Sequence, residues 1–209
     1  MGLSIYCIQM LNLLVMKIPH LGSFDMKKHL LNLTGVAVVL ELPEPVRSKI
    51  QKIREHFSSE LADAVPPEIT ITGSSGLGDL TPGQDPVFVI RELKKIAALT
   101  PAFKAIFGEV FQYPDSTVYA LKVEPVSRFQ ELHQRLAESQ IAFQPSPHPF
   151  FPHCSLHIWG ELTAAQQQEI FQVRLTEEFI IRTMALYQLV DTKAVALVER
   201  FKLGGMKKF

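Results

Sequence analysis

The sequence has no excess of charge of either sign. Its 209 residues include 21 basic and 21 acidic side chains, so the formal net charge is zero. Proteins that capture duplex DNA through its phosphates usually carry a surplus of lysine and arginine. We therefore expect no duplex DNA partner, although a small local site for one phosphate is compatible with this balance.

Cysteine is also scarce. Cys7 and Cys154 are the two cysteines, and they lie far apart in unlike contexts. Neither a disulfide framework nor a Cys-x-x-Cys metal site follows from this spacing. The pattern favours a protein of the reducing cytoplasm.

Long hydrophobic runs are missing, apart from one short stretch near the start. Residues 3–18 are largely apolar, with Lys17 as the one charged side chain, and the stretch is shorter than the about 20 residues of a membrane span. The stretch also lacks the basic region and cleavage site of a signal peptide. Because Met26 resembles a natural beginning, we expect residues 1–25 to be an extension outside a single domain over 26–209. A helix packed on that domain is the alternative, and we expect no membrane partner.

Hydrophobic periodicity divides the remainder into alternating strands and helices. Strands are predicted over 34–42, 68–72, 103–111, 117–123, 153–158, 179–189 and 194–201, and helices over 46–57, 87–99, 127–139 and from Thr163. Residues 73–85 read as a loop, and the proline-rich 144–152 as an extended segment. The hairpins imply antiparallel sheets, so the fold class is α+β, with an element order that repeats loosely in two halves.

The most informative stretch is His153-Cys154-Ser155-Leu156-His157. Its period-two alternation is typical of a half-buried strand, with both histidines and the serine on one face. Cys154 and Leu156 then point into a core. Imidazole and hydroxyl groups move protons and bind anions, so this face is a candidate catalytic strip.

A second strip lies upstream at residues 68–72, Glu-Ile-Thr-Ile-Thr. The same alternation puts Glu68 and Thr70 on one face. Two similar halves of a fold could bring the strips side by side across a cleft, although periodicity alone does not establish that they meet.

The two strips resemble the paired His-x-Thr/Ser-x motifs of the 2H phosphoesterase superfamily, the LigT-like or 2'-5' RNA ligase-like proteins. His153-Cys154-Ser155-Leu156, preceded by Phe-Pro, matches the second motif, and Glu68-Ile69-Thr70-Ile71, preceded by Pro-Pro, stands in the place of the first. The order of elements matches from about residue 34 to 203. The resemblance implies a bilobal α+β fold with two pseudo-symmetric antiparallel sheets around a central cleft and helices outside.

The resemblance also implies roles for individual residues. In the family, one motif histidine accepts a proton and the other donates one, while the motif hydroxyls hold the phosphate. Carried over, His153 is an acid/base group, and Thr70 and Ser155 hold the phosphate. Glu68 occupies the position of the other histidine. No metal or other cofactor is implied.

Two residues leave alternatives open. His157 shares the face of His153, so it is either a cleft residue or a buried core or rim histidine. Glu68 would be anionic at neutral pH and would repel a phosphodiester, unless burial raised its pKa. A carboxylate can nevertheless act as a general base opposite an imidazolium acid.

These observations lead to three functional hypotheses. The first is a metal-independent phosphoesterase, monomeric, acting on a 2',3'-cyclic phosphate, a 2'-5' linkage or a related small nucleotide or RNA terminal phosphate, with Glu68 and His153 as its catalytic pair. The second is a catalytically impaired module that binds a nucleotide or RNA end on the same fold. The third is an unrelated interaction protein in which the strips are incidental.

Overall fold

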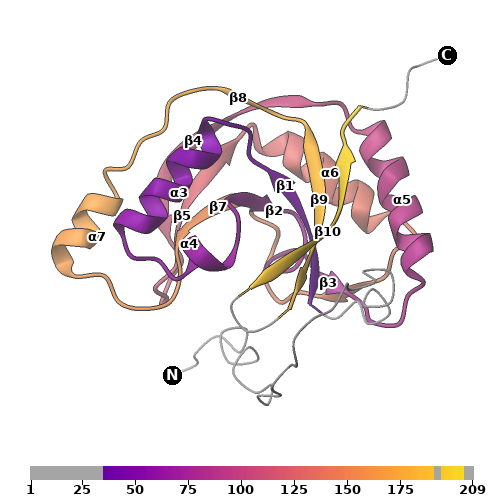
Figure 1. Cartoon of the computed structure of the whole chain (residues 1–209), viewed down its shortest axis with the longest axis horizontal. Helices are drawn as coiled ribbons and strands as arrows, with labels where there is room; N and C mark the ends of the chain where they lie inside the picture. Colours follow the sequence, from indigo (N-terminus) through magenta and orange to yellow (C-terminus); the bar gives the residue numbers. More distant parts are fainter. Residues whose placement is uncertain (1–34, 191–193, 205–209) are drawn as a thin grey trace, which may run out of the picture.

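The computed structural model describes residues 35–190 and 194–204 as strands and helices built around two four-stranded sheets (Figure 1). The expected extension over 1–25 and the expected domain start at 26 lie outside the described residues. Among the described residues, no helix is both long enough and apolar enough to cross a membrane.

The first sheet contains the upstream strip at its edge. Its strand order is β10-β9-β1-β2, with antiparallel pairing throughout. The strands are β1 (Val36–Glu41), β2 (Glu68–Thr70), β9 (Thr183–Leu189) and β10 (Val195–Lys202). In β1, Val36, Val38 and Leu40 are fully buried in the main core, as the β-branched sequence predicts.

The second sheet contains the downstream strip, again at an edge. Its order is β7-β5-β4-β8, also antiparallel. The strands are β4 (Phe103–Gln112), β5 (Tyr119–Glu124), β7 (His153–His157) and β8 (Phe179–Ile181). A small two-stranded sheet of β3 (Leu77–Leu80) and β6 (Phe143–Pro145) joins the segment after β2 to the segment before β7.

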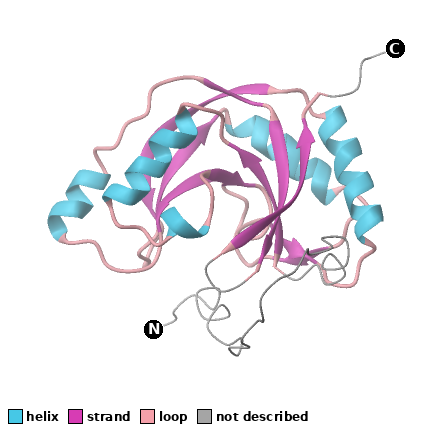
Figure 2. Cartoon of the chain, viewed as in Figure 1, coloured by secondary structure: helices cyan, strands magenta, loops and turns pink. Residues whose placement is uncertain are grey.

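The helices lie at the two sides of the strands (Figure 2). They are α3 (Val46–His56), α4 (Leu61–Ala64), α5 (Pro86–Leu99), α6 (Val126–Ala137) and α7 (Ala164–Ile170). Asp85 caps α5 by accepting a hydrogen bond from the Val87 amide, and Thr163 begins α7 with a complete capping box. The predicted start at Thr163 is therefore confirmed.

One continuous hydrophobic core is shared by both large sheets and the helices α3, α5 and α6. A smaller apolar cluster of Val39, Ala185 and Tyr187 lies on the other face of the first sheet. Because Val39 is the register partner of Thr70, the polar strip of β2 shares that second face. The α+β class is confirmed.

Two element predictions were wrong in detail. The expected loop 73–85 contains β3, where Gly78 packs so closely on β6 that a Cβ atom would lie 2.7 Å from the Gln144 carbonyl oxygen. The proline-rich segment expected to be extended begins with the strand β6, which agrees with that prediction. The single strand expected over 179–189 is two strands, since Phe179 and Ile181 fill the core beside β4 before the chain crosses to β1.

Candidate active site

The two strips predicted from the sequence lie next to each other. β2 and β7 are edge strands of different sheets, and their Cα atoms come within 8 Å of one another in the middle of the molecule (Figure 1). In the described chain no ladder joins these two strands, so the strands that carry the polar strips adjoin where the two halves of the fold abut. This position matches the expectation that the halves bring the strips side by side.

His153 is held through one ring nitrogen. Its Nδ1 lies 2.7 Å from the Phe151 carbonyl oxygen and 3.1 Å from the Tyr113 hydroxyl. A carbonyl oxygen can only accept, so Nδ1 must be the nitrogen that carries the hydrogen. In the neutral imidazole, Nε2 is then unprotonated and able to accept a proton.

The surroundings of His153 are aromatic. Tyr113 packs edge-on against the imidazole with ring centroids 5.4 Å apart, and Phe111 contacts Tyr113, Phe151 and the imidazole. The side chain is only 6% exposed. Burial lowers the pKa of His153, and the hydrogen bond to Phe151 opposes this in part. The neutral imidazole is consequently favoured near pH 7.

Glu68 is buried in the opposite strip. Its side chain is 8% exposed, and burial raises its pKa to about 7, against the opposing effects of Arg54 and Thr70. A glutamate with this pKa is roughly half protonated at neutral pH. It can therefore donate as well as accept a proton, which an exposed glutamate at pH 7 does poorly.

The two hydroxyls predicted to hold phosphate differ in their present partners. Thr70 Oγ1 donates to the Glu68 carboxylate, 3.0 Å from Oε1 and 3.1 Å from Oε2. Within the part of the chain that the structure describes, the Ser155 hydroxyl makes no hydrogen bond. Ser155 is thus free to donate, whereas Thr70 must first turn away from Glu68.

A search against family models matches the chain over residues 42–193 to the 2'-5' RNA ligase superfamily. The match covers both strips and the segments that position them. The chain belongs to the 2'-5' RNA ligase superfamily. The family that the two strips resemble is therefore confirmed.

Relatives of this superfamily member resemble it over most of their own length. A protein of Geobacillus sp. strain WCH70, named as a candidate phosphoesterase, is 31% identical over 161 residues, which are 74% of this chain and 88% of that protein. A protein of Oceanobacillus iheyensis, also named as a candidate phosphoesterase, is 28% identical over 167 residues, which are 76% of this chain and 92% of that protein.

Solved structures share the fold of this superfamily member. The protein TT0787 of Thermus thermophilus superposes with a TM-score of 0.56 at 19% identity, over 82% of this chain and 99% of its own. E. coli LigT in its apo form superposes with a TM-score of 0.53 at 18% identity, over 80% of this chain and 96% of its own. The LigT-like fold expected from the sequence is confirmed.

His157 and Cys154 are buried parts of the same strand. His157 is 3% exposed; its Nε2 lies 3.4 Å from the Gly160 carbonyl oxygen, and its Nδ1 is buried without a hydrogen-bond partner among the described residues. The contact of Nε2 with the Gly160 carbonyl oxygen of the following turn favours the core alternative over a role in a cleft. Cys154 is fully buried as expected, and burial raises the pKa of its thiol to about 12.

Sequence reasoning missed two residues beside the strips. Arg54 is fully buried in α3 and donates to the Ser155 carbonyl oxygen of β7. Its spacing of four from Ile50 and eight from Val46 puts it in the apolar stripe of the helix, which was a readable signal. Tyr113 follows β4 in a turn, and nothing in the local sequence indicates its contact with His153.

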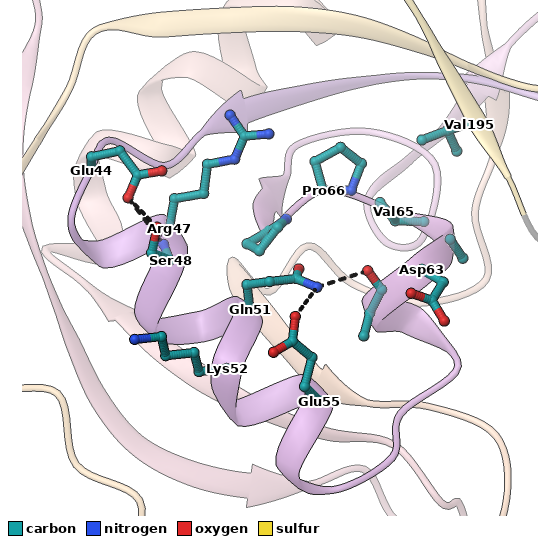
Figure 3. Close-up of a pocket in the computed structure, with 13 residues that line it drawn as sticks. Glu44, Arg47, Ser48, Gln51, Lys52, Glu55, Asp63, Val65, Pro66 and Val195 are labelled. Carbon is teal, nitrogen blue, oxygen red and sulfur yellow. Dashed lines mark hydrogen bonds between the residues drawn. The ribbon is translucent and has the colours of Figure 1, made fainter.

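A pocket of about 650 Å³ lies behind the upstream strip, between α3, α4 and the chain leading to β2 (Figure 3). Gln51 spans it by donating to Glu55 Oε1 at 3.1 Å and to the Ala62 carbonyl oxygen at 3.0 Å. Its lining mixes both signs of charge and does not include Glu68. The pocket reaches Pro67, the residue before Glu68, without containing the acid/base groups.

Proposed function

We propose that this chain is a metal-independent phosphoesterase that hydrolyses a 2',3'-cyclic phosphate, a 2'-5' linkage or a related ester at a small nucleotide or RNA end. One observation carries the proposal. A strand bearing Glu68 and Thr70 adjoins a strand bearing His153 and Ser155, each at the edge of its own sheet. Two proton-transfer groups and two hydroxyls are the set that in-line hydrolysis of a phosphodiester needs.

The pKa values of the two groups suggest their roles. His153, neutral near pH 7 with Nε2 unprotonated, accepts the proton of the attacking water. As the water oxygen bonds to phosphorus, the bond from phosphorus to the ribose oxygen breaks. Glu68, whose pKa is about 7, donates its proton to that leaving oxygen. Proton exchange with solvent then returns both groups to their starting states.

The hydroxyls supply the phosphate contacts. Ser155 donates to one non-bridging oxygen directly. Thr70 joins it when Glu68 is protonated, because a neutral carboxyl holds the hydroxyl hydrogen less strongly than a carboxylate does. Protonated Glu68 also removes the negative charge that would repel the phosphodiester.

The net charge of the chain and the ligand of a structural relative both support a small substrate. The balanced net charge gives no broad surface attraction for long polyanions, which favours a single phosphate at a nucleotide or RNA end. E. coli LigT, which shares the fold with a TM-score of 0.50, has a structure complexed with 3'-AMP. A small nucleotide is the ligand that we propose here.

The assay compares substrates with two kinds of leaving group, a ribose oxygen and a nitrophenolate. Hydrolysis of 2',3'-cyclic nucleotides, 2'-5'-linked dinucleotides and bis(p-nitrophenyl) phosphate is followed in EDTA for the wild type, Glu68→Gln and His153→Ala. Nitrophenolate departs without a general acid, so Glu68→Gln should lose about 10²-fold or more on the ribose esters and much less on the nitrophenyl ester. His153→Ala should lose activity on all three. Equal losses of Glu68→Gln on every substrate would refute the acid role.

A second function is favoured by the Thr70 hydrogen bond to Glu68, which occupies one of the two phosphate-holding hydroxyls. On this alternative the chain binds a nucleotide or RNA end without turnover. It predicts that the wild type binds 3'-AMP in calorimetry but hydrolyses none of the panel. Turnover of any ribose ester that His153→Ala abolishes would exclude it.

A further inference from the structure

Arg54 is a buried cation that donates hydrogen bonds to two backbone carbonyl groups. Its side chain is fully inaccessible, with Nε donating to the Ser155 carbonyl oxygen at 3.0 Å and Nη1 to the Val65 carbonyl oxygen at 2.7 Å. Its Nη2 is buried without a hydrogen-bond partner in the part of the chain that the structure describes. Taking a guanidinium out of water is strongly unfavourable unless an anion compensates its charge.

Two ionisable groups interact electrostatically with Arg54, namely the Cys154 thiol and the Glu68 carboxyl. The thiol, with its pKa raised to about 12 by burial, is neutral at physiological pH. Glu68 is then the group that can supply the compensating negative charge. No hydrogen bond joins Arg54 to Glu68 among the described residues, so the attraction between the two groups acts through space.

The other charged groups that face Glu68 are already compensated. Glu41 of β1 is its direct register partner. The Glu41 carboxylate accepts from Arg200 Nε of β10 at 2.9 Å and from the Tyr187 hydroxyl of β9 at 3.0 Å. Thr70 on β2 adds a neutral hydrogen bond to Glu68. Among the described residues, Arg54 is therefore the cation left to act on Glu68.

The same side chain bridges the two halves of the fold. Ser155 lies in β7, and Val65 lies three residues before β2, while no ladder connects these two described strands. The edge of β7 would otherwise leave the Ser155 carbonyl unpaired in the interior. A fixed spacing between the strands is needed, because a displacement of about 1 Å can cost 10²-fold in rate.

We propose that Arg54 is a positioning residue that ties the two strips together and places the compensating positive charge opposite Glu68. It does both from a fully buried position in α3, without touching substrate. This inference rests on the proposed function for its effect on rate, but its electrostatic part concerns Glu68 whether or not the chain turns over substrate.

The test separates the charge from the bridge. Arg54→Met removes the positive charge and both hydrogen bonds to the carbonyl oxygens. Arg54→Lys keeps the charge but reaches only one of the two carbonyl oxygens. Lys52→Met is the matched control, because it removes an exposed cation of the same helix. The Glu68 carboxyl is titrated by ¹³C NMR, with Glu68→Gln identifying its signal.

We expect the pH midpoint of the Glu68 carboxyl titration to rise by about 1 pH unit or more in Arg54→Met. In Arg54→Lys and Lys52→Met the midpoint should stay near its wild-type value. In the hydrolysis assay, Arg54→Lys should lose about ten-fold or more in kcat with little change in KM. A Glu68 titration unchanged in folded Arg54→Met overturns the charge role. If Arg54→Met does not fold, full kcat in Arg54→Lys overturns the bridging role. Inactivity of the wild type would refute the proposed function, while the NMR titration still decides the electrostatic part.

Discussion

The hydroxyl of Tyr113 lies 3.1 Å from Nδ1 of His153, forty residues away in the chain. The same nitrogen donates a hydrogen bond to the Phe151 carbonyl oxygen at 2.7 Å. The imidazole is therefore oriented by two groups, one just before β7 and one just after β4. Burial raises the pKa of the Tyr113 phenol to about 12, which keeps it neutral. Two neutral groups thus fix which ring nitrogen of His153 is free to act.

Tyr113→Phe should weaken the catalytic orientation of His153 without removing it. The Phe151 carbonyl still holds Nδ1, and one hydrogen bond of about 1 kcal/mol is lost, so we expect kcat/KM to fall about five-fold. Steady-state kinetics on a 2',3'-cyclic nucleotide measures this. Tyr119→Phe is the matched control, because its ring contacts His157 and not His153. An equal loss in both variants would contradict the orienting role.

Glu68 should make folding stability depend on pH. Its pKa is raised from about 4.5 to about 7 on folding, so the folded state binds the proton more tightly. The contribution to stability is complete below pH 4.5 and is lost as the pH rises through 7. Relative to wild type, Glu68→Gln should therefore gain up to about 3 kcal/mol in unfolding free energy between pH 4.5 and 8.

Urea denaturation at several pH values gives that difference. The control is Glu161→Gln, the same carboxylate-to-amide change at an exposed position. A pH profile for Glu68→Gln no steeper than that of the control would mean that Glu68 titrates normally in the folded protein.

A pair of glycines tests the connection between the strips. Gly76 and Gly83 both have positive φ, 68° and 86°, so alanine is strained at either by about 1–2 kcal/mol. At Gly76 a Cβ would also lie 2.3 Å from His133 Nε2, whereas at Gly83 no atom of the described chain lies within 4 Å. We expect Gly76→Ala to be less stable than Gly83→Ala by a further 1–3 kcal/mol, roughly.

The loss at Gly76 should extend to activity. Its amide donates to the His148 carbonyl oxygen at 2.7 Å, which connects the loop after β2 to the segment before β7. Thermal unfolding gives the stability difference and the hydrolysis assay the rate. Equal stability of the two variants would show that the loop yields to the added methyl group.

The strips and the fold class were readable from the sequence because period-two alternation directly encodes which side chains share a face. Cys154 and Leu156 are fully buried, as the alternation predicts. His153 and His157 on the other face are buried as well, so the expectation of a half-buried strand was wrong for β7. The order of strands and helices likewise predicted the α+β class, since the predicted helices over 46–57, 87–99 and 127–139 each have a clear apolar stripe.

The remaining features depend on contacts between distant segments. β3 and β6 are short and rich in turn residues, and they exist because they pair with each other. The spacing of Arg54 places it in the apolar stripe of α3, but its two carbonyl partners lie in other elements and could not be read from that helix. The raised pKa of Glu68 also follows from burial in the folded protein, which no local pattern encodes.

The most direct test of the Glu68–His153 pair is hydrolysis of 2',3'-cyclic nucleotides by the wild type, Glu68→Gln, His153→Ala, the double variant and Glu68→His. Two groups that act in one step are not additive, so the double variant should lose about as much as the worse single variant. We predict losses of about 10² to 10⁴ for each single variant. An inactive wild type with activity gained in Glu68→His would contradict the Glu–His pair, as would full activity in His153→Ala.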